Sequence, residues 1–244
     1  MNETATLITG SNGGVGQFIT KYLLEKGHRN LVCHYRSKND QVITLLKAFD
    51  LDPAKHSVQA DLSDENSISR MAQQIQINFK FVEKVVNVAG SSTNALSWKM
   101  TKQDFMHVLE DNLLTSFLCS KEFIPNMREQ KRGRIVNFSS IVGFTGVAGA
   151  AHYCAAKAGL VGLTKSISLE LASKGITVNA IALGYFNAGL LESVPAEMKQ
   201  EILKKIPMGR FGTGQDIGAA VEYLLSDSAQ FFTGQVLHLN GGQY

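Results

Sequence analysis

The sequence of 244 residues lacks the features that mark secreted, membrane-spanning and metal-binding proteins. It has only three cysteines, Cys33, Cys119 and Cys154, an odd number without CxxC spacing, so neither a disulfide framework nor a zinc site is expected. No apolar run reaches the length of a membrane span, and the stretch MNETATLITG lacks the basic and apolar segments of a signal peptide. We therefore expect a cytoplasmic protein with reduced thiols, no membrane segment and no metal.

Charge of one sign is also scarce. Lysine and arginine together number 24 against 21 aspartates and glutamates, a formal net charge of +3, and the basic residues are scattered along the chain. This pattern gives no reason to expect nucleic-acid binding. The composition is 44% hydrophobic and 18% charged, as in an ordinary globular protein, and a chain of this length can bury a sizeable core. We expect residues 1–244 to form a single domain.

Short runs of apolar and β-branched residues alternate with amphipathic stretches along the chain. The runs predict strands at residues 4–9, 31–35, 57–60, 82–88, 134–138, 176–182 and 236–239. The amphipathic stretches predict a helix that ends at Gly27 and helices at residues 40–49, 64–79, 101–130 (with Asn112 and Pro125 as candidate break points), 153–173, 196–205 and 216–225. Strands that alternate with helices imply βαβ crossovers. The expected fold is α/β, a single doubly wound parallel sheet of the Rossmann-like kind with helices on both faces.

A glycine-rich turn, TGSNGGVG at residues 9–16, follows the first predicted strand and opens the first predicted helix. In a doubly wound sheet, ligands bind beyond the carboxyl ends of the strands. Glycines there let the backbone approach a pyrophosphate, whose charge faces the amino end of the helix. Many glycine-rich turns only reverse the chain, but this placement favours a dinucleotide cofactor.

The residue about 20 positions past the last glycine separates NAD from NADP, because a carboxylate there hydrogen-bonds the ribose of NAD. Arg36 occupies that position, and no acidic residue occurs from Leu31 to Asn39. A guanidinium suits a 2′-phosphate, so we expect NADP (NADPH) rather than NAD. The alternative is that Arg36 and Lys38 belong to an ordinary solvated loop.

A serine, a tyrosine and a lysine occur in the stretch SSIVGFTGVAGAAHYCAAK, residues 139–157. Tyr153 and Lys157 are four residues apart in a helical pattern and therefore lie on one face. A fixed ammonium favours phenolate and should lower the pKa of Tyr153, as a proton donor requires. The preceding strand can bring Ser140 to the same place. Taken alone, the stretch also fits an amphipathic helix with a surface lysine.

Together these motifs resemble the short-chain dehydrogenase/reductase family, and the likeness runs from Thr4 to Gly242. The matching strings are TGxxxGxG at residues 9–16, Asp61-Leu62, NVAG at residues 87–90, Asn112, Ser140 and YxxxK at residues 153–157. The gap of 13 residues between Ser140 and Tyr153 is the spacing of the family, and it selects Ser140 rather than Ser139.

The resemblance implies a role for each matching residue. Tyr153 would be the general acid and Lys157 would stabilise its phenolate. Ser140 would hydrogen-bond the substrate carbonyl, and Asn112 would hold a water that relays protons. The residues that the resemblance assigns to the cofactor are Gly10, Asn12, Gly14, Val15, Gly16, Arg36, Asp61, Leu62, Asn87, Ala89, Gly90, Tyr153, Lys157 and Gly184.

Several strings are similar to those of family members that reduce 3-oxoacyl thioesters of acyl carrier protein or CoA. They are STNAL at residues 92–96, GRIVN at 133–137, AAKAGL at 155–160 and IPMGRFG at 206–212. The similarity implies NADPH-dependent reduction of such a thioester in fatty acid biosynthesis, a homotetramer, and a substrate-covering loop at about residues 185–207. It also implies docking of an acidic carrier protein at Lys131, Arg132 and Lys174, for which an ordinary helix-end role is the alternative.

Four positions depart from the family pattern. Val88 replaces an asparagine, Leu183 a proline, Ala188 a threonine that holds the nicotinamide, and Gly13 an arginine common in NADP-dependent members. Two alternatives therefore stand beside the thioester reductase. One is a reductase or dehydrogenase of another ketone or secondary alcohol. The other is a catalytically idle, nicotinamide-binding regulatory protein, against which the intact serine, tyrosine and lysine speak.

Overall fold

The computed structural model of the chain describes residues 3–187 and 194–244. In these residues, seven parallel strands form one sheet in the order β3-β2-β1-β4-β5-β6-β7. The strands are β1 (Ala5–Ile8), β2 (Leu31–Tyr35), β3 (Ser57–Gln59), β4 (Val82–Asn87), β5 (Gly133–Ser140), β6 (Ile176–Leu183) and β7 (Val236–Leu239). All the predicted strands are confirmed, with small shifts at their ends.

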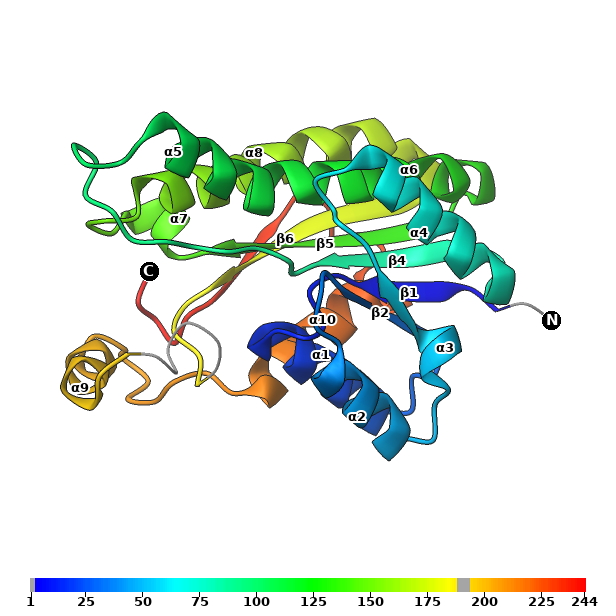
Figure 1. Cartoon of the computed structure of the whole chain (residues 1–244), viewed down its shortest axis with the longest axis horizontal. Helices are drawn as coiled ribbons and strands as arrows, with labels where there is room; N and C mark the ends of the chain where they lie inside the picture. The colour runs from blue at the N-terminus through cyan, green and yellow to red at the C-terminus, as the bar shows by residue number, and fades with distance from the viewer. Residues whose placement is uncertain (1–2, 188–193) are drawn as a thin grey trace.

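Helices cover both faces of this sheet (Figure 1). One face carries α4 (Glu65–Asn78), α5 (Lys102–Leu109), α6 (Thr115–Gln130) and α8 (Ala151–Leu171), and the other carries α1 (Gly14–Glu25), α2 (Asp40–Ala48) and α10 (Gly214–Leu225). The short helices and turns are α3 (Pro53–His56), α7 (Val142–Thr145), η2 (Ala172–Lys174), α9 (Ala196–Lys204) and η4 (Asp227–Ala229). The predicted doubly wound α/β fold is confirmed. Among the described helices, none combines the length and the hydropathy of a transmembrane segment.

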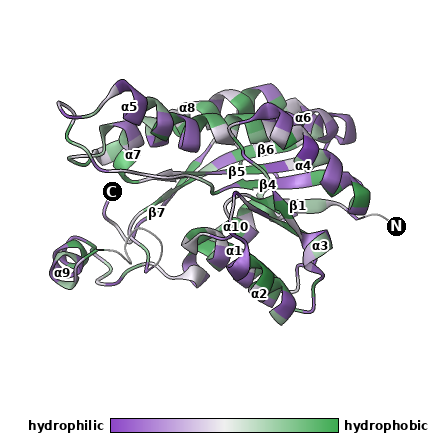
Figure 2. Cartoon of the chain, in the orientation of Figure 1, coloured by the Kyte–Doolittle hydropathy of each residue, from purple (hydrophilic) through white to green (hydrophobic). Residues whose placement is uncertain are grey.

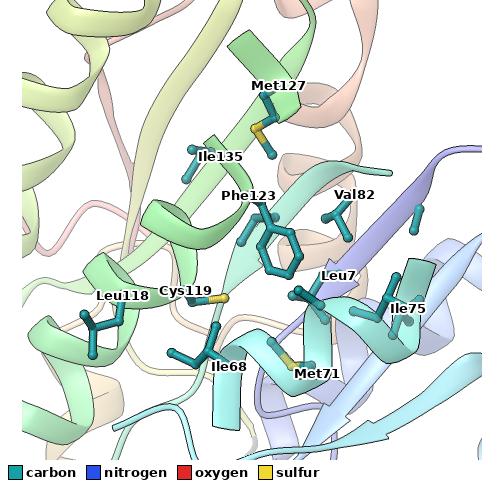
Figure 3. Packing of buried hydrophobic residues seen from close by; sticks show 14 of the residues in the cluster. Leu7, Ile68, Met71, Ile75, Val82, Leu118, Cys119, Phe123, Met127 and Ile135 are labelled. Atoms are coloured by element: carbon teal, nitrogen blue, oxygen red, sulfur yellow. The ribbon is translucent and has the colours of Figure 1, made fainter. Parts of the chain in front are cut away.

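Two apolar layers hold the helices to the sheet. In the layer under α4 and α6, Leu7 and Ile135 of the sheet pack with Met71 of α4 and Phe123 of α6 (Figure 3). A second layer joins α1 and α10 to the other face. Figure 2 shows hydrophilic colours on the outward sides of α4 and α5, as helices with one buried stripe require. The two layers fix the strand ends from which the loops of the candidate site emerge.

Local signals in the sequence set several helix ends. Asp64 caps α4 by accepting a hydrogen bond from the backbone of Asn66. Thr101 and Asp104 form a reciprocal capping box at the start of α5. At the end of α1, the chain passes through Gly27 with a φ of +88°, a left-handed conformation that favours glycine. The predicted helix stop at this residue is therefore confirmed.

The helix predicted at residues 101–130 is made of three consecutive pieces. Between α5 and α6, residues Glu110–Leu114 form a π turn, η1, with Asn112 at its centre. π turns inside helices are frequent at functional sites. Asn112 is thus a break point, as predicted. Pro125 is not, because it lies inside α6 without ending it.

The loop predicted at residues 185–207 to cover the substrate lies partly outside the described residues, since it includes 188–193. Its described part carries α9, which stands apart from the sheet and has no buried residue (Figure 1). That this loop covers the substrate stays a prediction.

Candidate functional site

A cavity of about 600 Å³ lies at the carboxyl ends of β1, β2 and β4. Its size is that of sites for cofactors and small molecules. Its walls come from the glycine turn, the segments after β2, β3 and β4, the π turn and α8. The predicted site residues that line it are Gly10, Asn12, Gly14, Val15, Gly16, Arg36, Asp61, Leu62, Ala89, Gly90, Asn112, Tyr153 and Lys157. Residues that are far apart in the sequence are therefore brought together as expected.

The glycine turn has no room for side chains at two positions. A Cβ on Gly10 would lie 2.9 Å from the Cα of Ala89, and one on Gly16 would lie 2.3 Å from the carbonyl oxygen of Gly10. The first helix begins at Gly14 after an N-cap, Gly13, that offers no side-chain hydrogen bond. The N–H groups at this end of α1 are therefore available to an anion. The turn fits the pyrophosphate of a dinucleotide.

Two polar side chains hold this turn in place. The Thr9 hydroxyl accepts hydrogen bonds from the backbone N–H groups of Val88 (2.9 Å) and Ala89 (3.0 Å). Nδ1 of His34 accepts one from the N–H of Gly10 at 3.1 Å, while its Nε2 lies 3.0 Å from the carbonyl oxygen of Ala60. Burial lowers the pKa of His34 and keeps the ring neutral, as an accepting Nδ1 requires. Sequence reasoning misses His34, whose only signal is its place beside the loop of Arg36.

Tyr153 and Lys157 project from the first turns of α8 into the cavity. Nζ of Lys157 donates a hydrogen bond to the carbonyl oxygen of Phe138 at 2.8 Å and lies 5.3 Å from the centre of the Tyr153 ring. Lys157 is only 5% exposed, and burial lowers its pKa to about 8.

The predicted lowering of the pKa of Tyr153 is wrong. Burial raises the pKa of this phenol to about 12. Desolvation disfavours the phenolate, and the ammonium of Lys157 faces the ring and the Phe138 carbonyl, so its attraction does not compensate. Tyr153 is therefore protonated near neutral pH.

The two neighbouring serines at the end of β5 have different surroundings. The Ser139 hydroxyl is buried and donates a 2.7 Å hydrogen bond to the backbone oxygen of Lys157, which fixes α8 against β5. Among the described residues, the Ser140 hydroxyl makes only long contacts, 3.4 Å to the oxygen of Leu183 and 3.3 Å to the N–H of Val142. Ser140 lies just outside the cavity lining. It is the less constrained hydroxyl, and its catalytic role stays a prediction.

Asn112 lines the cavity, and two backbone oxygens hold its side chain in place. Its Nδ2 donates to the backbone oxygens of Ser91 (2.7 Å) and Val108 (2.9 Å), which orients the side chain. Its Oδ1 is buried and, among the described residues, has no hydrogen-bond partner. This oxygen faces Gly90, where a Cβ would lie 2.4 Å from it and 3.7 Å from Nζ of Lys157. Buried polar atoms normally have partners, so the position suits a bound water or ligand.

Two predicted cofactor residues lie away from the cavity lining. The amide of Asn87 is buried behind it and donates 2.9 Å hydrogen bonds to Ser120 and Asn137, which joins β4 to α6 and β5. Gly184 follows β6, and a Cβ on it would lie 2.7 Å from the Cα of Asn240. Their cofactor contacts stay predictions. Asn87 is well placed to position the strand ends.

The four departures from the family pattern fall in different places. Val88 and Gly13 line the cavity, whereas Leu183 ends β6 beside β7. Ala188 lies outside the described residues. The cavity wall is thus apolar at Val88 and open at Gly13.

Arg36 lies at the cavity between two carboxylates. Its guanidinium is 3.4 Å from an oxygen of Asp61 and 3.4 Å from an oxygen of Asp111. Hydrogen bonds from the side chain and backbone of Ser63, together with Arg36, hold the pKa of Asp61 below its ordinary value. Sequence reasoning misses Asp111, because nothing in the sequence indicates that it meets Arg36, which lies 75 positions away.

The residues predicted to dock a carrier protein lie at the amino ends of β5 and β6, opposite the cavity. Lys131 adjoins Gly175, where a Cβ would lie 2.7 Å from the Lys131 oxygen. Arg132 instead binds Glu83 at 2.8 Å and Asp227 at 3.4 Å. Lys131 and Lys174 thus remain candidates, whereas the guanidinium of Arg132 is engaged within the chain.

Comparison with known proteins covers nearly the whole chain. A family model described as enoyl-(acyl carrier protein) reductase matches residues 10–243. The chain is 37% identical over 243 residues to a 3-oxoacyl-(acyl-carrier-protein) reductase of Staphylococcus aureus, with 98% of each chain covered. It is 36% identical over 244 residues to the enzyme of the same name from Haemophilus influenzae, covering 100% of this chain and 99% of the other.

Proposed function

The chain belongs to the short-chain dehydrogenase/reductase family, and on that premise we propose that it reduces 3-oxoacyl thioesters to 3-hydroxyacyl thioesters with NADPH. The observation that carries the proposal is that Tyr153, Lys157 and Asn112 line the same cavity as the glycine turn. The relatives named for 3-oxoacyl substrates, which match nearly end to end, support the substrate class.

The residues of the cavity suit a nicotinamide dinucleotide. The glycine turn and the uncapped start of α1 would hold the pyrophosphate, Asp61 and Leu62 the adenosine, and Lys157 a ribose. Arg36 supports NADPH, since a guanidinium suits a 2′-phosphate. When bound, the cofactor supplies the hydride that reduces the ketone carbon.

The side chains around the cavity supply the proton and the polar contacts. Because burial keeps its phenol protonated, Tyr153 can donate a proton to the carbonyl oxygen of the substrate. The loosely held hydroxyl of Ser140 hydrogen-bonds that oxygen as negative charge develops on it. A water held by Asn112 and the ammonium of Lys157 then relay a proton from solvent back to Tyr153.

Turnover with a simple substrate tests the proposal. Purified protein mixed with NADPH and acetoacetyl-CoA should lower the absorbance of the reduced nicotinamide and yield 3-hydroxybutyryl-CoA. NADH should support a slower reaction. Efficient reduction of an unrelated ketone, with no turnover of acetoacetyl-CoA, would assign the chain to another carbonyl substrate. Binding of NADPH without turnover of any carbonyl compound would support the alternative of a catalytically idle, nicotinamide-binding regulatory protein.

We also propose a homotetramer in which the faces of α6 and α8 pack between subunits. An apolar groove lies between α8 and the segment that runs from α5 through η1 to the start of α6, with half-exposed Leu114 and Phe117 on one side and Gly159 and Gly162 on the other. Glycines on one wall allow a helix of a second copy to approach closely. Sedimentation should give a tetramer, and Gly162→Glu should reduce it to smaller species.

Docking of an acyl carrier protein at Lys131 and Lys174 belongs to the same proposal. Because these lysines lie at the far end of the sheet from the cavity, a carrier bound there would serve the cavity of another subunit. The double variant Lys131→Glu/Lys174→Glu should raise KM for the carrier-bound substrate and leave KM for acetoacetyl-CoA unchanged. Equal KM changes for both substrates would contradict this docking site.

A further inference from the structure

We propose that Asp111 is a specificity-determining residue of the cofactor cavity, which opposes a 2′-phosphate by holding the guanidinium of Arg36. The inference rests on the proposed function, because it concerns the selectivity of the same cavity. Asp111 acts through Arg36 and is therefore a positioning residue rather than a catalytic one. It would make the preference for NADPH over NADH smaller than Arg36 alone would give.

Arg36 divides its guanidinium between two carboxylates. One terminal nitrogen lies 3.4 Å from Oδ1 of Asp111, and the other lies 3.4 Å from Oδ2 of Asp61. Charge-assisted N–H···O hydrogen bonds usually measure about 2.7–2.9 Å, so neither contact is tight. The nitrogens that a phosphate would use are thus already engaged, but by contacts that a phosphate can displace.

The two carboxylates oppose a phosphate to different degrees. Asp61 is 44% exposed, and its other oxygen closes a turn with Ser63, at 3.0 Å to the N–H and 2.7 Å to the hydroxyl. Asp111 is only 11% exposed, and its other oxygen accepts a 2.6 Å hydrogen bond from Ser91 and lies 3.6 Å from Nε2 of His107. Water screens a buried charge less than an exposed one. Asp111 therefore exerts the stronger field on Arg36.

The charges at this end of the cavity cancel. Arg36 and Lys38 contribute +2, while Asp61 and Asp111 contribute −2, and all four line the cavity. His34 adds nothing, because burial lowers its pKa and keeps it neutral. A 2′-phosphate, with a charge of roughly −1.5 to −2, therefore meets Arg36 and Lys38 but no net positive charge. Removal of the Asp111 charge leaves a net +1.

Binding measurements on Asp111→Asn test the inference without relying on turnover. Dissociation constants of NADPH and NADH are measured by nicotinamide fluorescence, and those of 2′-AMP and 5′-AMP by calorimetry. Asp111→Asn should bind 2′-AMP and NADPH about tenfold more tightly than the wild type, as loss of one nearby negative charge predicts. The constants for 5′-AMP and NADH should change less than about twofold.

Three further variants separate charge from structure. Asp111→Glu keeps the charge and should keep the wild-type ratio of NADPH to NADH affinity. Glu129→Gln removes an exposed carboxylate near the end of α6, at the other end of the sheet, and should change neither affinity. In an Arg36→Ala background, Asp111→Asn should improve 2′-AMP binding by less than about threefold, because its partner is gone.

The outcomes distinguish a failure of the inference about Asp111 from a failure of the proposed function. If the wild type binds NADPH but Asp111→Asn binds 2′-AMP equally or more weakly, the inference is overturned and the proposed function stands. If the wild type binds neither dinucleotide, the proposed function itself is overturned, and the inference with it. If Asp111→Asn does not fold by circular dichroism, Asp111→Ser removes the same charge and is judged by the same outcomes.

Discussion

The two ends of the sheet hold their buried charges in opposite ways. At the amino end, the carboxylate of Glu83 accepts 2.8 Å hydrogen bonds from both Arg132 and Thr4. Arg134, also buried, pairs with Asp227 at 3.2 Å and donates to backbone oxygens. Each buried charge there has an opposite charge beside it.

At the carboxyl end, the corresponding groups are less fully compensated. Buried Lys157 donates to a neutral carbonyl oxygen, and the buried Oδ1 of Asn112 has no hydrogen-bond partner among the described residues. An ion buried without an opposite charge costs stability, and proteins accept this cost where function requires it. The amino end thus fixes the fold, while the carboxyl end keeps polar groups available for ligands.

Loss of the acid at the carboxyl end should have the largest effect. Tyr153→Phe removes the proposed proton donor and should lower kcat by at least about 1,000-fold, within the range of general acid catalysis. NADPH binding and the free energy of unfolding should stay close to those of the wild type, because the half-buried ring is retained. Kinetics and fluorescence titration measure both. Turnover like that of the wild type would show that another group is the acid.

Replacement of Lys157 should lower turnover to a smaller extent than loss of the acid, but stabilise the fold. The pKa of Lys157 falls to about 8 from an ordinary value near 10.5, so the folded state disfavours its charged form. Below pH 8 the lysine is charged in both states, and Lys157→Met should raise the free energy of unfolding by on the order of 2 kcal/mol. Urea denaturation at pH 7 and at one protein concentration measures the difference.

The sign of the pH dependence follows from the same lowered pKa. Between pH 8 and 10.5 the unfolded chain binds more protons than the folded one at Lys157, so this residue makes stability rise with pH. Above about pH 9, the thiols of Cys33 and Cys119, whose pKa values burial raises to about 12, act in the opposite direction. The advantage of Lys157→Met should therefore shrink from pH 8 to 9. An advantage that grows with pH would contradict the buried cation.

A side chain added to the glycine turn should weaken NADPH binding and destabilise the fold. A Cβ at Gly16 would lie 2.3 Å from the carbonyl oxygen of Gly10, so Gly16→Ala must shift the backbone. We expect about 2 kcal/mol of destabilisation and about 30-fold weaker NADPH binding. At Gly13 in the same turn, the nearest atom would be 3.4 Å away, so Gly13→Ala should leave the free energy of unfolding nearly unchanged. Equal destabilisation by both variants would show that the close approach is not the cause.

Features of the fold and the site that depend on neighbouring residues can be predicted from the sequence, whereas features that depend on distant segments cannot. The strands follow from apolar runs, and Tyr153 and Lys157 follow from helical spacing, because both are local patterns. The short helices α3 and α7 do not, since four residues carry no periodicity. The direction of the Tyr153 pKa shift depends on burial by distant segments, which spacing cannot reveal.

Charged partners across the fold were the hardest part to predict. Arg36 stands out in the sequence, but its contact with Asp111 joins residues 75 positions apart. The sequence predicts that Arg132 is available to a partner, yet its guanidinium binds Glu83 and Asp227 at the amino end. Such pairings are set by the order of the strands, so only the assembled sheet shows which charges are available for ligands.

The smallest effect should come from the amino end, where charge serves stability alone. Arg134→Met keeps the aliphatic stem but loses the contact with Asp227 and the hydrogen bonds to the oxygens of Gly133 and Gly175. We expect a loss of about 1–2 kcal/mol in the free energy of unfolding and no change in kcat/KM. Exposed Lys80→Met, near the same end, should change stability by less than about 0.5 kcal/mol. A fall in kcat/KM for Arg134→Met, with stability unchanged, would mean that the two ends do not divide stability and function between them.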